Sequence, residues 1–94
     1  MLYVISCTDK PGHGAVRQEN RPAHLDYLKA KGATLRLAGP YTADDGEAVL
    51  GSLIVVDVAD RAAAVAIAAG DPYAKAGLFE SVEITAFRCA VGEL

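Results

Sequence analysis

The run "LGSLIVVDV" at residues 50–58 constrains the fold most, because the strand that it predicts is apolar on both of its faces. Successive side chains of a strand point to opposite faces. Leu53 and Val55 therefore share one face, while Ile54 and Val56 share the other. A strand of this kind is typical of a sheet that is covered on both sides.

The other segments place this strand in a recognisable order. Apolar, β-rich runs predict four strands, and two helical segments lie between them, the first closed by Gly32 and the second running from an Asp60 cap to Gly70. The predicted strands are residues 1–8, 33–38, 50–58 and 78–90, with a polar loop at 39–48 and a short connection at 71–77. The order β-α-β-β-α-β predicts an α+β, ferredoxin-like fold, with a four-stranded antiparallel sheet and two helices on one face. A chain of 94 residues is sized for one such domain, spanning residues 1–94.

Two helices cover one face of this sheet and leave the other face without cover. That face carries Leu53, Val55 and Phe87. Large exposed apolar patches are uncommon on monomers, so we expect a homodimer that pairs through the helix-free sheet face. The alternative is a sheet with an exposed apolar face.

Composition excludes several classes of function. The net charge is −3, and the nine basic residues are scattered, so nucleic-acid binding is not expected. No run of 18 apolar residues predicts a membrane span, and the N-terminal residues do not resemble a secretory signal. The two cysteines, Cys7 and Cys89, do not form a disulfide framework, so we expect a reducing, cytoplasmic location. A disulfide between the two remains an open alternative.

The segment "NRPAHLDYLKAKG" at residues 20–32 holds the first candidate for chemistry. Pro22 fits the first turn of a helix; alternatively, the helix begins near Ala15 and Pro22 kinks it. His24 lies four residues before Leu28 and thus borders the buried face of that helix. It is either a packed histidine with a satisfied ring or an acid–base group.

Asp71 favours the second interpretation. It follows the second helix directly, and Pro72 stiffens the backbone beside it. We expect the second helix to end level with the C-terminal end of the first, so that the Asp71 carboxylate reaches His24 and orients its imidazole for general acid–base catalysis. The alternative is a carboxylate that only closes the helix.

Three further residues are candidates for contacts with a small-molecule ligand. Arg21 is suited to an anionic group beside His24, or it is a solvated residue of the first turn. Tyr41 and Tyr73 each follow a proline and either line the pocket or pack in the core. No metal is expected, because His13, His24 and Asp71 lack ligand spacing, and the sequence has no phosphate-binding glycine pattern, so no cofactor is expected.

Several segments together resemble one family. They are "MLYVISCTDK", "RPAHLDYL" at 21–28, "AGPY" at 38–41, "GSLIVVD" at 51–57 and "DPYAKAGLFESVEI" at 71–84, and they are similar to the YCII-related (YciI-like) proteins. The resemblance implies a ferredoxin-like fold that forms dimeric α+β barrels. It also implies an active-site histidine and aspartate, which match His24 and Asp71. Related α+β barrel enzymes include lyases, isomerases and monooxygenases that act on small, often aromatic, molecules.

These observations lead to one main hypothesis and two alternatives. The main hypothesis is an enzyme that uses His24 and Asp71 as an acid–base pair on a small molecule, in a lyase or isomerase type of reaction without a cofactor. The first alternative is a binding or regulatory homodimer that uses the same cleft without turnover. The second is a structural dimer with His24 packed in its core.

Overall fold

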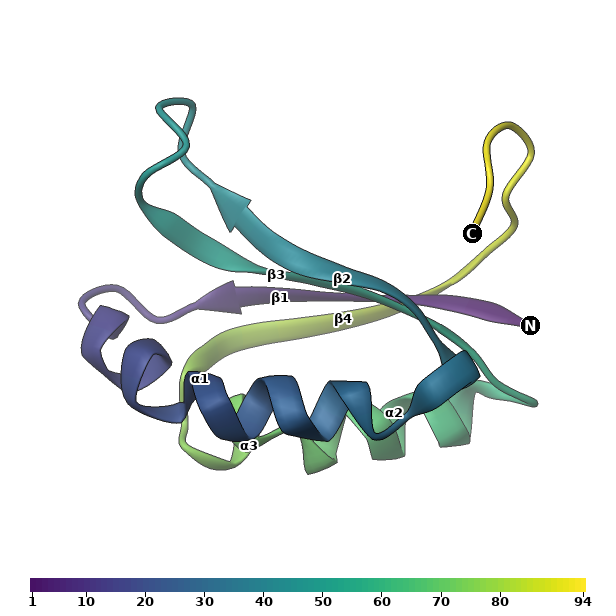
Figure 1. Cartoon of the computed structure of the whole chain (residues 1–94), viewed down its shortest axis with the longest axis horizontal. Coiled ribbons are helices and arrows are strands. Elements are labelled where there is room, and N and C mark those ends of the chain that lie inside the picture. The colour runs from purple at the N-terminus through teal and green to yellow at the C-terminus, as the bar shows by residue number, and fades with distance from the viewer.

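The computed structural model describes all residues 1–94 and consists of one sheet with its helices on a single face (Figure 1). The spatial order of the strands is β2-β3-β1-β4, and every neighbouring pair is antiparallel. The predicted ferredoxin-like α+β fold is therefore confirmed. The strands are β1 (Leu2–Asp9), β2 (Leu35–Thr42), β3 (Val49–Asp57) and β4 (Phe79–Phe87), and the helices are α1 (Gly14–Lys29), α2 (Arg61–Gly70) and the short α3 (Pro72–Lys75).

The hydrophobic core lies between the helices and the covered face of the sheet. Alternation along the central strands turns one set of side chains toward the helices, as the sequence predicts. Alanines on the buried side of α2 let this helix lie close to the strands, and the Asp60 carboxylate caps it by accepting a hydrogen bond from the Ala63 N–H at 2.9 Å. The core residues are Tyr3, Ile5, Cys7, Leu28, Ile54, Val56, Ala64 and Ala68.

No helix covers the opposite face of the sheet (Figure 1). Leu53 and Val55 point to this face, because their neighbours Ile54 and Val56 belong to the core. Val55 is flanked by apolar residues on both neighbouring strands and is 3% exposed. Phe87 on β4 and Leu37 on β2 remain 44% and 38% exposed. This open face is thus apolar and partly in contact with solvent.

The strand β2 is longer than predicted, which changes the place of two candidate residues. Pro40 and Tyr41 belong to this strand and not to a loop. A proline is tolerated here because β2 is an edge strand, where the missing N–H costs no ladder hydrogen bond. The strand β4 is shorter than predicted, because it ends at Phe87 and not at residue 90.

The helix α1 begins at Gly14 and contains Pro22 in its interior, which settles the two alternatives for its start. Its first turns do not continue along the axis of the remaining turns (Figure 1). The helix ends at Lys29, and Gly32, with φ +57°, begins a 3₁₀ turn at Gly32–Thr34 instead of closing α1 as expected. None of the helices combines the length and the apolar character that crossing a bilayer requires.

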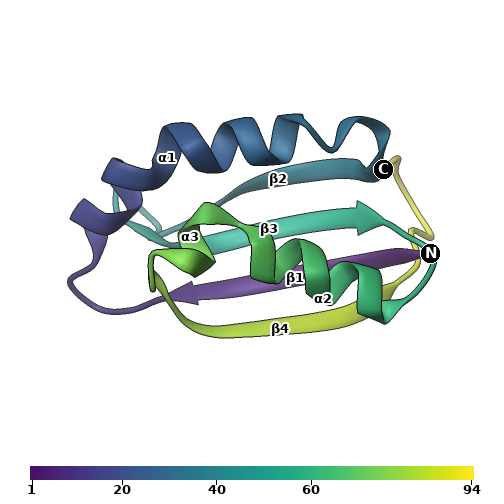
Figure 2. The same cartoon turned by 90° about the horizontal axis from the view of Figure 1, so that it is seen from below.

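The second helix ends at a different place along the first from the one that the sequence predicts. Helices α1 and α2 run antiparallel, so the end of α2 lies beside the middle of α1 and not beside its C-terminal end (Figure 2). The Tyr27 hydroxyl of α1 fixes this contact by donating a hydrogen bond of 2.8 Å to the Ile67 carbonyl of α2. The connection after α2 therefore meets α1 at the turn that carries His24.

Candidate active site

His24 and Asp71 form a buried hydrogen-bonded pair between α1 and the start of α3. The His24 Nδ1 atom lies 2.8 Å from the Asp71 Oδ1 atom. The two residues are 7% and 1% exposed, so water competes little for this hydrogen bond. The second carboxylate oxygen, Oδ2, is buried without a hydrogen-bond partner. His24 is therefore the only side chain that compensates this carboxylate by a hydrogen bond.

The local sequence explains why Asp71 is held in place. Asp71 ends α2 and also caps α3, where its Oδ1 atom accepts a hydrogen bond of 2.9 Å from the Tyr73 N–H. Pro72 occupies the first position of α3, where a proline is favourable. An aspartate cap followed by proline is a helix start signal. The sequence pattern predicts only a connection at residues 71–77, and the structure differs by this short helix.

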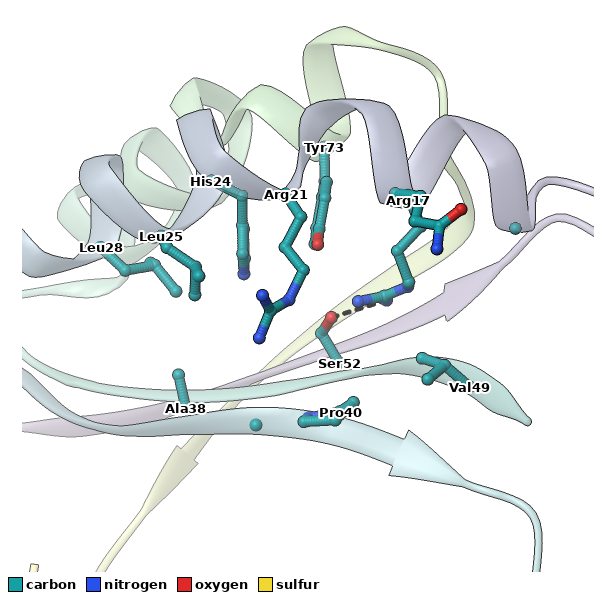
Figure 3. A pocket seen from close by; sticks show the side chains of 13 residues that line it. Arg17, Arg21, His24, Leu25, Leu28, Ala38, Pro40, Val49, Ser52 and Tyr73 are labelled. Carbon is teal, nitrogen blue, oxygen red and sulfur yellow. Dashed lines mark hydrogen bonds between the residues drawn. The ribbon is translucent and has the colours of Figure 1, made fainter. Parts of the chain in front are cut away.

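Tyr73 is the centre of a three-layer stack. The His24 ring lies on one side of the Tyr73 ring, with ring centroids 3.8 Å apart and an interplanar angle of 13°. The Arg17 guanidinium lies on the other side, 4.7 Å from the Tyr73 centroid (Figure 3). Two hydrogen bonds of 2.8 and 2.9 Å tie Arg17 to Asp9, and a third of 2.9 Å reaches the Ser52 hydroxyl. The Tyr73 ring is therefore held from both sides, and it fixes the plane of the imidazole from one side.

A pocket of about 590 Å³ opens beside this stack, between α1 and the strands β2 and β3. One side of α1 supplies the upper wall, with positions spaced three or four residues apart. Small side chains on the strands, Ala38, Pro40 and Ser52, form the floor and leave room for a ligand (Figure 3). The lining residues are Gly14, Arg17, Gln18, Arg21, His24, Leu25, Leu28, Ala38, Gly39, Pro40, Val49, Ser52 and Tyr73.

Burial and the neighbouring charges set the ionisation of the groups around the pair. Burial raises the pKa of the Tyr73 phenol, and the positive charges of Arg17 and Arg21 offset part of this effect. Burial opposes the charged form of Arg17, but its hydrogen bond to Asp9 and the Asp9 charge prevail and raise the pKa of Arg17. At neutral pH, Tyr73 thus presents a neutral hydroxyl and Arg17 a fixed positive charge.

The thiol of Cys7 on β1 is buried in the core. Burial, reinforced by the negative charge of Asp71, raises the pKa of this thiol to about 12. Cys7 is therefore a neutral core residue at physiological pH. Both Cys7 and Cys89 are free thiols in this structure.

Four of the five predicted site residues come together, and one does not. Arg21, His24 and Tyr73 line the pocket, and Asp71 lies behind it, bound to His24. Tyr41 lies on the open face of the sheet instead, where its hydroxyl is 2.9 Å from the Ser6 hydroxyl. The reason is the extension of β2, because alternation turns Tyr41 away from the face that bears Pro40.

Arg17 and Ser52 line the pocket but are not among the site residues that the sequence predicts. Arg17 lies four residues before Arg21 and seven before His24, which is the spacing of one helix face. This spacing points to Arg17 only when the helix begins before Arg17, as α1 does at Gly14. Ser52 shares the covered face of β3 with Ile54 and Val56, and nothing local distinguishes it. No group of three or more His, Cys, Asp or Glu side chains converges as a metal site in this structure.

The arrangement is suited to proton transfer. A carboxylate only accepts hydrogen bonds, so the Asp71 contact places a proton on His24 Nδ1. In the neutral imidazole, the lone pair is then on Nε2. The ring points from α1 toward the cavity, and Nε2 is its far nitrogen (Figure 3). The lone pair of an oriented imidazole therefore faces the space that a ligand would occupy.

Comparisons with known proteins agree with this description. The model of the YCII-related domain matches residues 1–88. Protein YciI of Escherichia coli is 39% identical over 95 residues, which cover 94% of this chain and 97% of that protein. A solved structure of 5-chloro-2-hydroxyhydroquinone dehydrochlorinase from Burkholderia phenoliruptrix, in complex with 2,5-dihydroxybenzoquinone, matches with a TM-score of 0.85 and 30% identity over 94% of each chain.

A more distant match concerns the fold alone. A protein structure from Arabidopsis thaliana matches 99% of this chain and 98% of its own length with a TM-score of 0.51 and 11% identity.

Of these proteins, the dehydrochlorinase is an enzyme. It has the same fold as this chain, and the similarity extends over nearly the whole length of both.

Proposed function

The chain belongs to the YCII-related domain family, and we propose that it is an enzyme in which His24 acts as the acid–base catalyst on a small organic molecule. The observation that carries this proposal is the 2.8 Å contact between His24 Nδ1 and Asp71 at the wall of the pocket. The contact orients the Nε2 lone pair toward a ligand. Asp71 is a positioning residue, because its carboxylate is buried behind the imidazole.

An elimination or an isomerisation suits this set of groups. In an elimination, His24 Nε2 accepts a proton from the substrate, the bonding electron pair forms a new double bond, and the leaving group departs with its own electron pair. In an isomerisation, the same nitrogen returns the proton at another atom. General acid–base catalysis by one positioned side chain contributes about 10²- to 10⁴-fold to a rate. The Tyr73 hydroxyl, a neutral donor at the same wall, is placed to bind a substrate oxygen.

The similarity to the dehydrochlorinase supplies the first substrate to test. Chloride release measures the elimination of HCl from 5-chloro-2-hydroxyhydroquinone. Incorporation of deuterium from the solvent measures proton transfer on a panel of small enols and phenols. We expect His24→Gln to lose about 10²-fold or more of the activity found. Asp71→Asn removes the charge but keeps the side-chain shape, and we expect a smaller loss. Ligands that bind to the pocket without any turnover would contradict catalysis and favour the binding or regulatory alternative.

Pairing of two copies through the open face of the sheet is part of the same proposal. The supporting observation is the set of apolar side chains there that no helix covers, among them Phe87 and Leu37. A second copy presents the same surface, and a two-fold interface is self-complementary. The pocket lies on the helical side of the sheet, so pairing would leave its lining residues accessible.

A further inference from the structure

The charges at the pocket wall are unusual for this protein. The chain as a whole has twelve acidic and nine basic residues and a net charge of −3. The pocket lining nevertheless contains two arginines and no aspartate or glutamate. Asp9 and Asp71 approach from behind the wall, each bound to one of its members. The surface that faces a ligand is therefore positive.

The two arginines are not equivalent. Arg17 is compensated by Asp9 through two hydrogen bonds and is held further by Ser52. Arg21, one turn along α1, is exposed and takes part in none of the ion pairs of the structure. Its guanidinium extends from α1 into the cavity between His24 and Ser52 (Figure 3). Arg21 is thus the one uncompensated positive charge at the pocket.

The remaining wall combines uncharged polar groups with an apolar side. Tyr73 and Ser52 carry hydroxyls, and Leu25, Ala38 and Pro40 offer flat or apolar contact. A guanidinium binds carboxylates and other charged oxygens through parallel hydrogen bonds. The volume of about 590 Å³ accommodates a small ring system. Such a wall fits a compact molecule with an apolar body and a charged oxygen.

We propose that the pocket binds a small organic anion whose charged oxygen contacts the Arg21 guanidinium while its body lies against the apolar side. This inference rests on the proposed function, since it names the substrate class of that same pocket. It also gives Arg21 a role in the proton transfer. The Arg21 charge stabilises the negative charge that develops on a substrate oxygen when His24 Nε2 removes a proton. Arg21 is then a substrate-binding residue, and Arg17 holds Tyr73 in the stack.

A pair of probes that differ in charge tests the proposal without turnover. The anionic probe is 2,5-dihydroxybenzoquinone, which ionises at neutral pH because its charge spreads over the ring oxygens. The uncharged probe is 2,5-dimethoxybenzoquinone, which has the same ring. Binding to the full-length protein is measured by calorimetry and by NMR shifts of the His24 and Tyr73 ring signals. We expect the anion to bind at least tenfold more tightly than the dimethyl ether.

Two variants assign the effect to one side chain. Arg21→Gln should weaken binding of the anion at least tenfold and leave binding of the ether unchanged. Lys29→Gln removes the same charge from an exposed position of α1 outside the pocket and should change either affinity less than twofold. Equal affinity for both probes, an unchanged affinity in Arg21→Gln, or no binding of the anion at millimolar concentration would overturn the proposal. Because no step depends on catalysis, anion binding can stand or fall independently of the acid–base function.

Discussion

Replacing Phe87 by aspartate is the sharpest perturbation of the proposed pairing. Phe87 lies opposite Leu2 in the register of β4 and β1, on the face of the sheet that no helix covers. Its side chain is 44% exposed in the single chain. If a second copy covers this face, the exposed part of the ring becomes buried in the dimer.

The size of the effect follows from that exposed fraction. A phenylalanine offers about 200 Å² of surface, so roughly 90 Å² would be removed from water in each copy. At about 25 cal/mol per Å², this is about 2 kcal/mol per copy and about 4 kcal/mol for the two-fold pair. Each 1.4 kcal/mol changes a dissociation constant tenfold, so Phe87→Asp should weaken dimerisation by about a thousandfold or more. The new carboxylate adds a desolvation cost in the same direction.

Sedimentation equilibrium over nanomolar to micromolar concentrations measures this change directly. Val65→Asp is a matched control, since Val65 is an apolar residue of α2 that is 47% exposed on the helical side. We expect the control to dimerise like the unmodified chain. A stable, folded monomer of the unmodified chain at micromolar concentration would refute the reasoning, and so would a Phe87→Asp variant that dimerises normally.

Three further predictions concern stability, each measured by denaturant unfolding. The pKa of Cys7 is about 12, against 9.0 for an unperturbed thiol, so unfolding releases a proton above pH 9. Between about pH 9 and pH 12, the free energy of unfolding should therefore fall by about 1.4 kcal/mol per pH unit more than in Cys7→Ala. Parallel curves for the two proteins would contradict this. Gly51→Ala should lower the free energy of unfolding by at least about 3 kcal/mol, because a Cβ there would meet the Cys7 carbonyl oxygen on the neighbouring strand β1. Gly39→Ala is the control, since a Cβ there meets nothing within 4 Å, and it should lower this free energy by less than about 1 kcal/mol. Leu28→Ala should cost about 2–5 kcal/mol, because Leu28 is 3% exposed in the core, and a loss below 1 kcal/mol would show that α1 does not depend on this contact.

Much of the fold follows from the sequence because its strands have strong, local signals. The run around Leu53 and Val55 predicts a strand that is apolar on both faces, and this strand is β3, which pairs with both β1 and β2. The alternation also predicts correctly that these side chains point away from the helices. Element order then restricts the topology to a ferredoxin-like sheet.

The errors concern features that depend on tertiary context. The sequence predicts Tyr41 near the ligand, because Pro40 is typical of a loop. Proline is acceptable in β2, however, because β2 is an edge strand, and as a strand residue Tyr41 points away from the pocket. The sequence predicts a second helix that ends level with the C-terminal end of the first, and this position is wrong, although the predicted contact between His24 and Asp71 forms. The contact forms because α1 and α2 run antiparallel, which places the residues after α2 beside the middle turns of α1 (Figure 2).

The candidate site was only partly visible for the same reason. Asp71 and His24 stand out locally through their prolines and helix positions. Arg17 does not, since its role depends on a partner at the end of β1, Asp9, and on a ring at the start of α3, Tyr73. Such a set is assembled by the packing of three elements, and the spacing along α1 gives only the helix face of Arg17, not its partners Asp9 and Tyr73.

The protonation pattern of the His24 ring tests the central claim most directly. Nitrogen-15 NMR at alkaline pH, where imidazoles are neutral, distinguishes a proton on Nδ1 from one on Nε2 without requiring a known substrate. We predict a proton on Nδ1, hydrogen-bonded to Asp71, and an unprotonated Nε2; in Asp71→Asn this preference should weaken, because an amide both donates and accepts hydrogen bonds. A ring protonated on Nε2 in the unmodified chain would contradict the account, because no lone pair would then face the pocket.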